Sequence, residues 1–404
     1  MHALKIFEKY IPYLLPFLLI FFRGLADLTV LLIGMLFIYK SYKDSNWLWT
    51  NEKWFKFSLI FILYLLIINS SLSINPHDSI FYAVTFVRWP IFAIALYFWI
   101  FKSNDSINKF LVSLSLVLFF LILDVWYQFI TGADIFGYEK YSPGRLTGPL
   151  RNNPVIGIFI TKYLYLFLTS LIIFKIFDKK YLRVISLISL ICLGFITVLI
   201  TGERMSIILF TSSIFIVMTG VGGHKIEKLY GLLITIFLLL GCLEIMQLTY
   251  PLVAERAINS VVYKLQNFPE SDYGMVFRTA YHVWLQNPLF GGGLHQFKEL
   301  PNLYGINIWD GAKIFHPHNH PLSLLAETGI IGLVLFYTII IQILIKALIP
   351  VINKKEWFKL ALLFNLLYIC FFPFMTHFSF QHNWMNATNW LIVGFVLALA
   401  KKYE

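Results

Sequence analysis

The chain has 404 residues, of which 59% are hydrophobic and 13% are charged, and its mean hydropathy is +0.74. Soluble domains carry about 25% charged residues, so this composition indicates a membrane protein surrounded by lipids and excludes an ordinary soluble domain. The formal net charge of +11 does not indicate a nucleic-acid partner, because the Lys and Arg residues stand in short clusters between apolar runs.

The apolar runs predict an all-α polytopic membrane protein with about twelve spans, since one span needs roughly 20 apolar residues to cross a hydrocarbon core of ~30 Å. In chain order, the predicted spans cover residues 11–22, 28–39, 57–68, 81–101, 110–130, 155–174, 182–200, 206–219, 229–248, 330–345, 358–374 and 384–400. The first two runs are short and are separated by Arg23, Gly24 and Asp27. One long helix there would move the N-terminus to the other side of the membrane. We expect residues 1–404 to form a single integral membrane domain.

The distribution of basic residues predicts which side each loop faces. If both termini are cytoplasmic, the inside segments hold 20 of the 32 Lys and Arg residues. The positive-inside rule then places residues 249–328, the one long segment between predicted spans, on the outer side. We expect this segment to be a folded subdomain between spans nine and ten. A smaller outer segment, 131–153, carries Lys140, Arg145 and Arg151.

The cysteines and the start of the chain give two further expectations. Cys192, Cys242 and Cys370 each stand alone inside an apolar run, without CxxC or Cys/His spacing, so we expect neither a disulfide framework nor a zinc site. The first apolar run lacks a small-residue cleavage site and leads into another span, so we expect no removed signal peptide.

The densest group of reactive side chains is His316-Pro317-His318-Asn319-His320, just before the tenth predicted span. A metal site is one interpretation, but the cluster has no His-Glu-x-x-His pattern and no carboxylate or Cys partner at ligand spacing. A general base is another, because a neutral imidazole with a pKa near ~6.5 can accept a proton from a sugar hydroxyl. A third is a set of surface histidines without a role.

Three short motifs in the C-terminal half carry a family resemblance. They are TGERMS at 201–206, FRTAY at 277–281 with NPLFGGG at 287–293, and His318-Asn319 followed after nine residues by GIIG at 329–332. Together, in this order and on one side of the membrane, they resemble the O-antigen ligase and polymerase superfamily, and the ligases most closely. The resemblance extends over roughly residues 200–332 and more loosely over the twelve-span layout.

The resemblance implies a GT-C-like glycosyltransferase in the bacterial inner membrane, with its active site on the periplasmic side. It implies transfer of an O-antigen glycan from undecaprenyl diphosphate to a sugar hydroxyl of lipid A-core, with inversion and without a metal ion or other cofactor. His318 would be the base, and Arg204 and Arg278 would stabilise the departing diphosphate. His316 and Asn319 would orient the base or the acceptor.

Several other residues are candidates for substrate binding. Arg145 and Arg151 in the smaller outer segment would reach the same cavity or stay on the loop surface. Arg88 and Lys162 lie within predicted spans, where a charge costs about 2.5–3.5 kcal/mol at the bilayer centre. We expect them either to pair with Asp124, a third ionisable residue in a span, or to share a diphosphate site with Arg204.

The two arginines have structural alternatives, and the external aromatic residues are candidates for binding sugars. Arg204 would be a snorkelling residue at a span end, and Arg278 would pair with Glu270 or Asp272. The external aromatic side chains that suit sugar stacking are Trp284, Tyr304 and Trp309.

Two other functions compete with ligation. An O-antigen polymerase would use a second lipid-linked glycan as acceptor, and a protein-glycosylating relative would use a protein. A secondary transporter would explain the charges in the spans, but it predicts an internal repeat and Gly- or Pro-broken spans in both halves. The sequence shows neither clearly.

Overall fold

A computed structural model describes residues 2–174, 180–221, 225–306, 316–376 and 382–404, and these residues are predominantly helical. Up to the long external segment, the helices are α1 (His2–Phe21), α2 (Arg23–Lys43), α3 (Lys53–Leu63), α4 (Pro76–Phe86), α5 (Arg88–Ala95), α6 (Asn104–Thr131), α7 (Ile156–Ile173), α8 (Lys180–Ile200), α9 (Arg204–Gly220) and α10 (Lys225–Thr249). After that segment come α15 (His320–Asn353), α16 (Trp357–Phe371) and α17 (Asn383–Ala400). Short π-helical or 3-10 turns cover Leu48–Asn51, Tyr64–Asn69, Leu96–Ile100, Gly148–Leu150 and Lys401–Tyr403.

The chain is an all-helical membrane protein. In its described part, five helical stretches are long and apolar enough to cross a membrane, namely Arg23–Lys43, Pro76–Ile100, Asn104–Thr131, Ile156–Ile173 and His320–Asn353. Each of the twelve predicted apolar runs overlaps a helix. The count of twelve spans and the GT-C-like architecture remain predictions.

The first two apolar runs belong to separate helices. Phe22 between α1 and α2 has φ −130° and ψ 91°, which is extended backbone and ends the first helix. The two helices pack against each other, and α1 also packs along α6. A single long helix at the N-terminus is therefore excluded.

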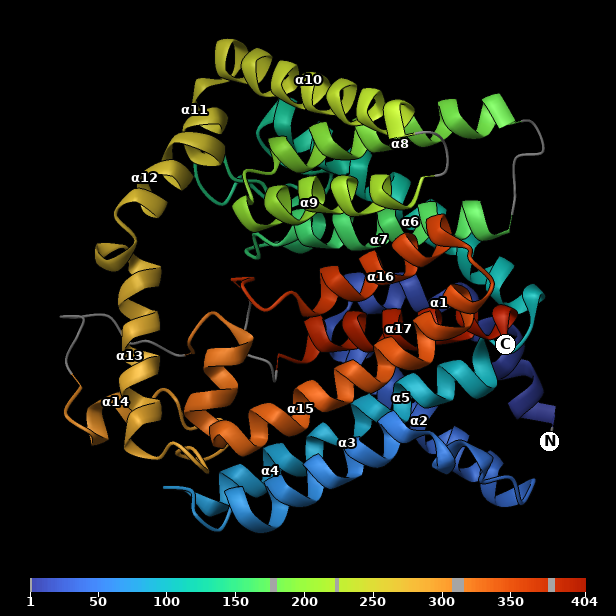
Figure 1. Cartoon of the computed structure of the whole chain (residues 1–404), viewed down its shortest axis with the longest axis vertical. Helices are drawn as coiled ribbons and strands as arrows, with labels where there is room; N and C mark the ends of the chain where they lie inside the picture. Colours follow the sequence, from blue (N-terminus) through green and yellow to red (C-terminus); the bar gives the residue numbers. More distant parts are fainter. Residues whose placement is uncertain (1, 175–179, 222–224, 307–315, 377–381) are drawn as a thin grey trace.

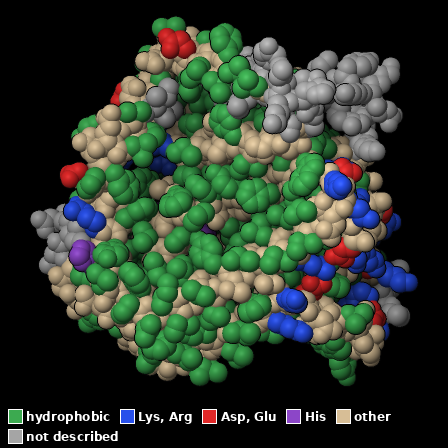
Figure 2. All heavy atoms as spheres, in the orientation of Figure 1, with side chains coloured by type: hydrophobic (Ala, Val, Ile, Leu, Met, Phe, Trp, Pro, Cys, Tyr) green, Lys and Arg blue, Asp and Glu red, His purple; other side chains and the backbone are tan. Residues whose placement is uncertain are grey.

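The long helices lie side by side, with the external segment at one end of the bundle and both termini at the other (Figure 1). We call the end that carries the external segment the loop end. Figure 2 shows Lys and Arg side chains gathered over the end that carries the termini. The positive-inside rule would place this end in the cytoplasm, and this orientation remains a prediction.

The external segment is helical and has a small core of its own. It contains α11 (Pro251–Ala254), a π-helical turn (Glu255–Asn259), α12 (Ser260–Gln266), a 3-10 turn (Phe268–Glu270), α13 (Asp272–Gln286) and α14 (Leu300–Leu303). Buried side chains of α13 and α14 pack with Phe297 and with Ala326 at the start of α15. Its predicted end at residue 328 differs from the helix boundary, because α15 already begins at His320 and is interrupted at Gly329.

Glycines join the external segment to α15. The backbone N–H groups of Gly292 and Gly293 donate to the carbonyls of Ala326 and Glu327, each at 2.9 Å. Gly329 has φ +66° and ψ −175°, a conformation open essentially only to glycine, and a Cβ there would overlap a neighbouring carbonyl. The two glycine motifs seen in the sequence therefore pack on each other at the point where α15 is interrupted.

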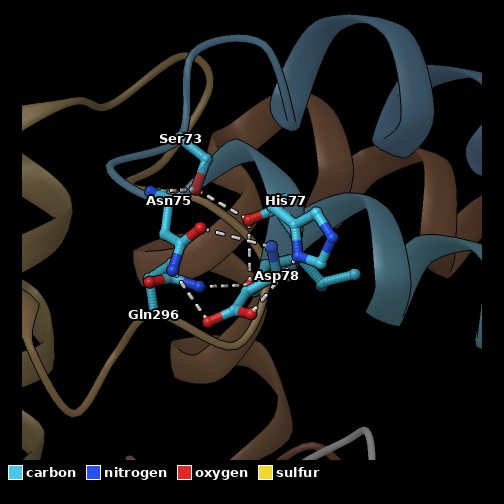
Figure 3. A network of polar contacts seen from close by, with 7 residues as sticks. Ser73, Asn75, His77, Asp78 and Gln296 are labelled. Carbon is cyan, nitrogen blue, oxygen red and sulfur yellow. Dashed lines mark hydrogen bonds and ion pairs between the residues drawn. The ribbon is translucent and has the colours of Figure 1, made fainter.

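The start of α4 holds the same external segment from the other side (Figure 3). Asn75 caps α4 by accepting a hydrogen bond from the Asp78 backbone N–H at 3.3 Å, and its amide donates to the Asp78 carboxylate at 2.8 Å. The hydroxyl of Ser79, the residue after Asp78, donates to the Leu294 carbonyl of the external segment at 3.1 Å. The Gln296 side chain, within that segment, donates to the same carbonyl at 3.3 Å. The external segment is thus tied to the membrane helices at two places.

The orientation is open to direct measurement, because exposed residues mark both ends of the bundle. Asn302 on α14 and Asn46 in the turn after α2 are both exposed. In cells with a permeabilised outer membrane, an impermeant thiol reagent should label Asn302→Cys, whereas Asn46→Cys should react only after lysis. The opposite pattern would contradict the orientation and, with it, chemistry on the outer side.

Candidate functional site

A cavity of about 530 Å³ opens at the loop end of the bundle. Its walls come from the start of α7, the turn before α9, the segment from α11 to α13, and residues 372–376 after α16. Most lining side chains are apolar, among them Ile158, Met205, Phe277 and Phe374. The charged and titratable lining residues are Arg145, Glu203, Arg204, Arg256, Lys264, Tyr273 and His318.

His318 lies in a turn directly before α15 and has φ +55°. Its ring centroid lies 4.1 Å from that of His316 and 6.1 Å from that of Tyr273. The residue as a whole is exposed, but nearby protein removes part of the hydration of the imidazole, which lowers its pKa. His318 is therefore neutral at pH 7 and can accept a proton from a group in the cavity.

His316 stands behind His318 and does not line the cavity. Burial, with smaller contributions from the neighbouring His318, His382 and His320, lowers its pKa to about 3. A neutral His316 next to His318 adds no charge that would oppose protonation of the neighbouring ring.

Asn319 shapes the cavity without lining it. Its side-chain oxygen accepts a hydrogen bond from the Leu322 backbone N–H at 3.1 Å, which caps α15. Its amide donates to the Pro373 carbonyl at 2.7 Å, and its backbone forms a β-bridge with Thr376. Because residues 372–376 form one wall of the cavity, Asn319 holds that wall beside His318.

Arg204 and Arg256 come from distant parts of the chain and meet at the cavity. Arg204 is the first residue of α9, and its Nε donates to the Arg256 carbonyl at 3.1 Å. The Nε of Arg256 donates to the Gly202 carbonyl, also at 3.1 Å. Burial, together with the positive charges of Arg145 and Arg204, lowers the pKa of Arg256. The cavity therefore concentrates positive charge.

Glu203 is the only acidic residue among the described lining residues. Its carboxylate accepts a hydrogen bond from the Ile158 backbone N–H at 3.0 Å, at the N-terminal end of α7. Burial raises its pKa to about 7, against the opposing effects of hydrogen bonds from Ser206 and of the Arg145 charge. Glu203 holds the turn that carries Arg204 against α7.

The structure brings Arg145, Arg204 and His318 of the predicted site together at the cavity. Arg278 does not line it, because its guanidinium donates to the Pro269 carbonyl at 2.8 Å on the exposed side of α13. Asp272, one suggested partner of Arg278, pairs with Lys264 at 2.8 Å. Arg151 is exposed, with its guanidinium 5.6 Å from the centre of the Tyr138 ring.

The ionisable residues in the spans have partners that the sequence did not predict. Arg88 lies 3.6 Å from Asp27 and donates to the Asn383 side chain at 2.6 Å. Lys162 is fully buried and donates to the Asn389 side chain at 2.6 Å. Asp124 accepts a hydrogen bond from the Ile135 backbone N–H at 2.9 Å. Their positions are explained by these local contacts, and the predicted ion pair of Asp124 with Arg88 or Lys162 is not present.

The external aromatic residues are also placed away from the cavity. The Trp284 indole donates to the Pro288 carbonyl at 3.0 Å, and Tyr304 packs against the small external core. Trp309 lies outside the described residues. Within the described parts of the chain, no three His, Cys, Asp or Glu residues are grouped closely enough to hold a metal ion.

The fold and the site define a helical membrane protein with a cation-lined cavity at the loop end. Residues 163–337, which include Arg204, Arg256 and His318, match the model of the O-antigen ligase family. This match supports the O-antigen ligase superfamily, to which the sequence motifs pointed. No curated protein matches the chain.

Asn319→Asp tests whether this side chain holds the wall of the cavity. A carboxylate can still accept from Leu322, but it cannot donate to the Pro373 carbonyl and would repel it. We expect a loss of about 1–3 kcal/mol in the free energy of unfolding, the cost of an unsatisfied buried group. The measurement is thermal unfolding in detergent, with the exposed Asn302→Asp as matched control. Equal thermal unfolding midpoints for Asn319→Asp and Asn302→Asp would contradict the role of Asn319 in holding this wall.

Proposed function

We propose that the chain is a glycosyltransferase of the bacterial inner membrane. It moves an O-antigen glycan from undecaprenyl diphosphate to a sugar hydroxyl of lipid A-core at the periplasmic face. The observation that carries this proposal is that His318 and Arg204 line one cavity at the loop end, inside the segment that matches the O-antigen ligase family.

The chemistry needs a base, an anion site and a water-poor wall, and the cavity supplies candidates for each. Neutral His318 accepts the proton of the acceptor hydroxyl as that oxygen attacks the anomeric carbon. The bond from this carbon to the diphosphate oxygen breaks, and the lipid diphosphate leaves with the electron pair. Arg204 stabilises the charge that develops. Attack opposite the leaving group inverts the anomeric centre, and we propose this step without a metal ion or other cofactor.

The acceptor distinguishes ligation from polymerisation, since both reactions use the same donor. Deletion of the gene and analysis of the surface glycan provide the test. Core that lacks long chains, with lipid-linked polymer intact, would support the ligase. Core that carries single repeats would instead support a polymerase, whose acceptor is a second lipid-linked glycan.

His318→Ala should lower turnover by about 100-fold or more, because general bases contribute roughly 10²–10⁴ in rate. Donor binding should change little, since the substitution removes a neutral side chain. Turnover of a purified lipid-linked donor and donor affinity are the two measurements. Full turnover by a folded His318→Ala protein would exclude His318 as the general base.

Arg278→Lys separates two roles of this residue. The resemblance assigns Arg278 to the diphosphate, whereas in the structure it holds the Pro269 carbonyl next to Phe268, which lines the cavity. A lysine can still donate to Pro269, but it cannot bind a phosphate through two parallel bonds. Severe loss of donor affinity, comparable to that of Arg204→Lys, is the result expected for the diphosphate role. Wild-type kinetics of Arg278→Lys would show that Arg278 only holds the turn that contains Pro269.

A further inference from the structure

Three segments that are far apart in sequence meet beside the cavity, and each contributes one arginine to its lining. They are the loop residues 142–146 with Arg145, the turn and helix start 201–204 with Arg204, and the helical residues 252–256 with Arg256. We call these three segments the arginine platform. Their association depends on close backbone contacts, so the relative positions of the three arginines are fixed by the main chain.

Glycines make these contacts. Gly202 has φ +63°, and a Cβ there would overlap the Gly144 carbonyl. Gly144 has φ +68°, and a Cβ there would lie 2.8 Å from the Leu252 carbonyl oxygen. The Leu146 backbone N–H also donates to the Thr201 carbonyl at 3.1 Å. The three segments therefore pack main chain against main chain. A side chain at Gly144 or Gly202 would prevent this packing.

Reciprocal hydrogen bonds then orient two of the guanidinium groups. Arg204 Nε donates to the Arg256 carbonyl, and Arg256 Nε donates to the Gly202 carbonyl. The Ser260 hydroxyl donates to the same Arg256 carbonyl at 2.9 Å. Each Nε is used to hold the neighbouring segment, and within the described residues the outer nitrogens of both guanidinium groups make no hydrogen bond and can bind a ligand.

Neighbouring carboxylates offset the charges of the arginine platform only in part. Among the described residues, Arg145, Arg204 and Arg256 form no ion pair, and Glu203 is turned to the backbone of α7. The Nε of Arg145 is buried and has no hydrogen-bond partner in the described part of the chain. Like charges brought this close destabilise the fold unless an anion binds between them. This arrangement is suited to a ligand with more than one negative charge.

We propose that Arg256 determines the specificity of this site for a lipid diphosphate over a lipid monophosphate, acting with Arg204 and Arg145. The inference rests on the proposed function, because it names a further ligand of the same donor. A diphosphate presents two phosphoryl groups, which separate guanidinium groups can bind at once, whereas a monophosphate presents one. Since Arg256 follows α11, the site is complete only when this external segment is docked on the turn before α9.

Binding of short lipid probes to the purified full chain tests the proposal. Farnesyl diphosphate and farnesyl monophosphate carry the same apolar tail, so the ratio of their dissociation constants reports the phosphate site alone. We expect the wild-type protein to prefer the diphosphate by about tenfold or more, which corresponds to ~1.4 kcal/mol. Arg256→Gln should bring the ratio close to one while monophosphate affinity changes little, and Arg256→Lys should retain part of the preference.

Lys298→Gln is the matched control, because Lys298 is an exposed basic residue of the same external segment that pairs with Glu299 at 3.5 Å. The Lys298→Gln protein should keep the wild-type ratio of the two dissociation constants. Thermal unfolding of each variant shows that it is folded. If Arg256→Gln loses its fold, Arg256→Lys provides the comparison.

The outcomes separate this inference from the proposed function. A wild-type ratio in a folded Arg256→Gln protein, or no preference in the wild-type protein, would overturn the role of Arg256. Glycan transfer by wild type, with an unchanged donor KM in Arg256→Gln, would also overturn it while leaving the proposed function in place. Loss of the preference in the variant, in a protein that transfers no glycan, would support the inference and contradict the proposed function.

Discussion

The site depends on backbone contacts that only glycine allows. Gly202 and Gly144 bring the turn before α9, the loop after α6 and the start of the external segment into direct main-chain contact. Gly329 and the glycines at 291–293 do the same where the external segment meets α15. The first junction positions Arg204 and Arg256, and the second holds the external segment on α15, which begins two residues after His318. Without these contacts, the segments that line the cavity would have no fixed relation to one another.

The surrounding side chains set the electrostatics that the chemistry requires. Burial keeps His316 and His318 neutral, so the histidine cluster adds no positive charge that would hinder proton acceptance. Glu203 is bound by the N-terminal end of α7, and its pKa of about 7 means that it offsets the arginines only in part at neutral pH. A cavity with apolar walls and excess positive charge suits a ligand that joins an apolar chain to an anionic group.

The helices that contain the apolar runs were predictable, because the composition of each run already indicates a span. The histidine turn and Arg204 were predictable from short motifs that stand close to helix starts. Arg256 was not, because it lies among residues without a motif, and its importance comes from a contact with Gly202, 54 positions away. The start of α15 at His320 was also missed, because the predicted span began at residue 330, whereas Asn319 caps the helix and proline is acceptable in its first turn.

The partners of the buried charges show a similar limit. Asp124, Arg88 and Lys162 appeared to be candidates for one another because each is ionisable and lies in an apolar run. The structure gives each a different partner, and two of these partners, Asn383 and Asn389, are neutral amides on α17. Amides carry no charge signal in a sequence, so their role in holding buried cations becomes visible only when the helices are packed.

Glycan transfer by the purified chain in proteoliposomes tests the proposed reaction itself. The assay supplies a defined undecaprenyl-diphosphate glycan and a lipid A-core acceptor, and it determines the anomeric configuration of the new linkage by NMR. We expect one molecule of lipid diphosphate to be released for each glycan transferred, with inverted configuration and in the presence of a chelator. Retained configuration, or no transfer to any sugar hydroxyl acceptor by the folded wild-type protein, would contradict the proposed reaction.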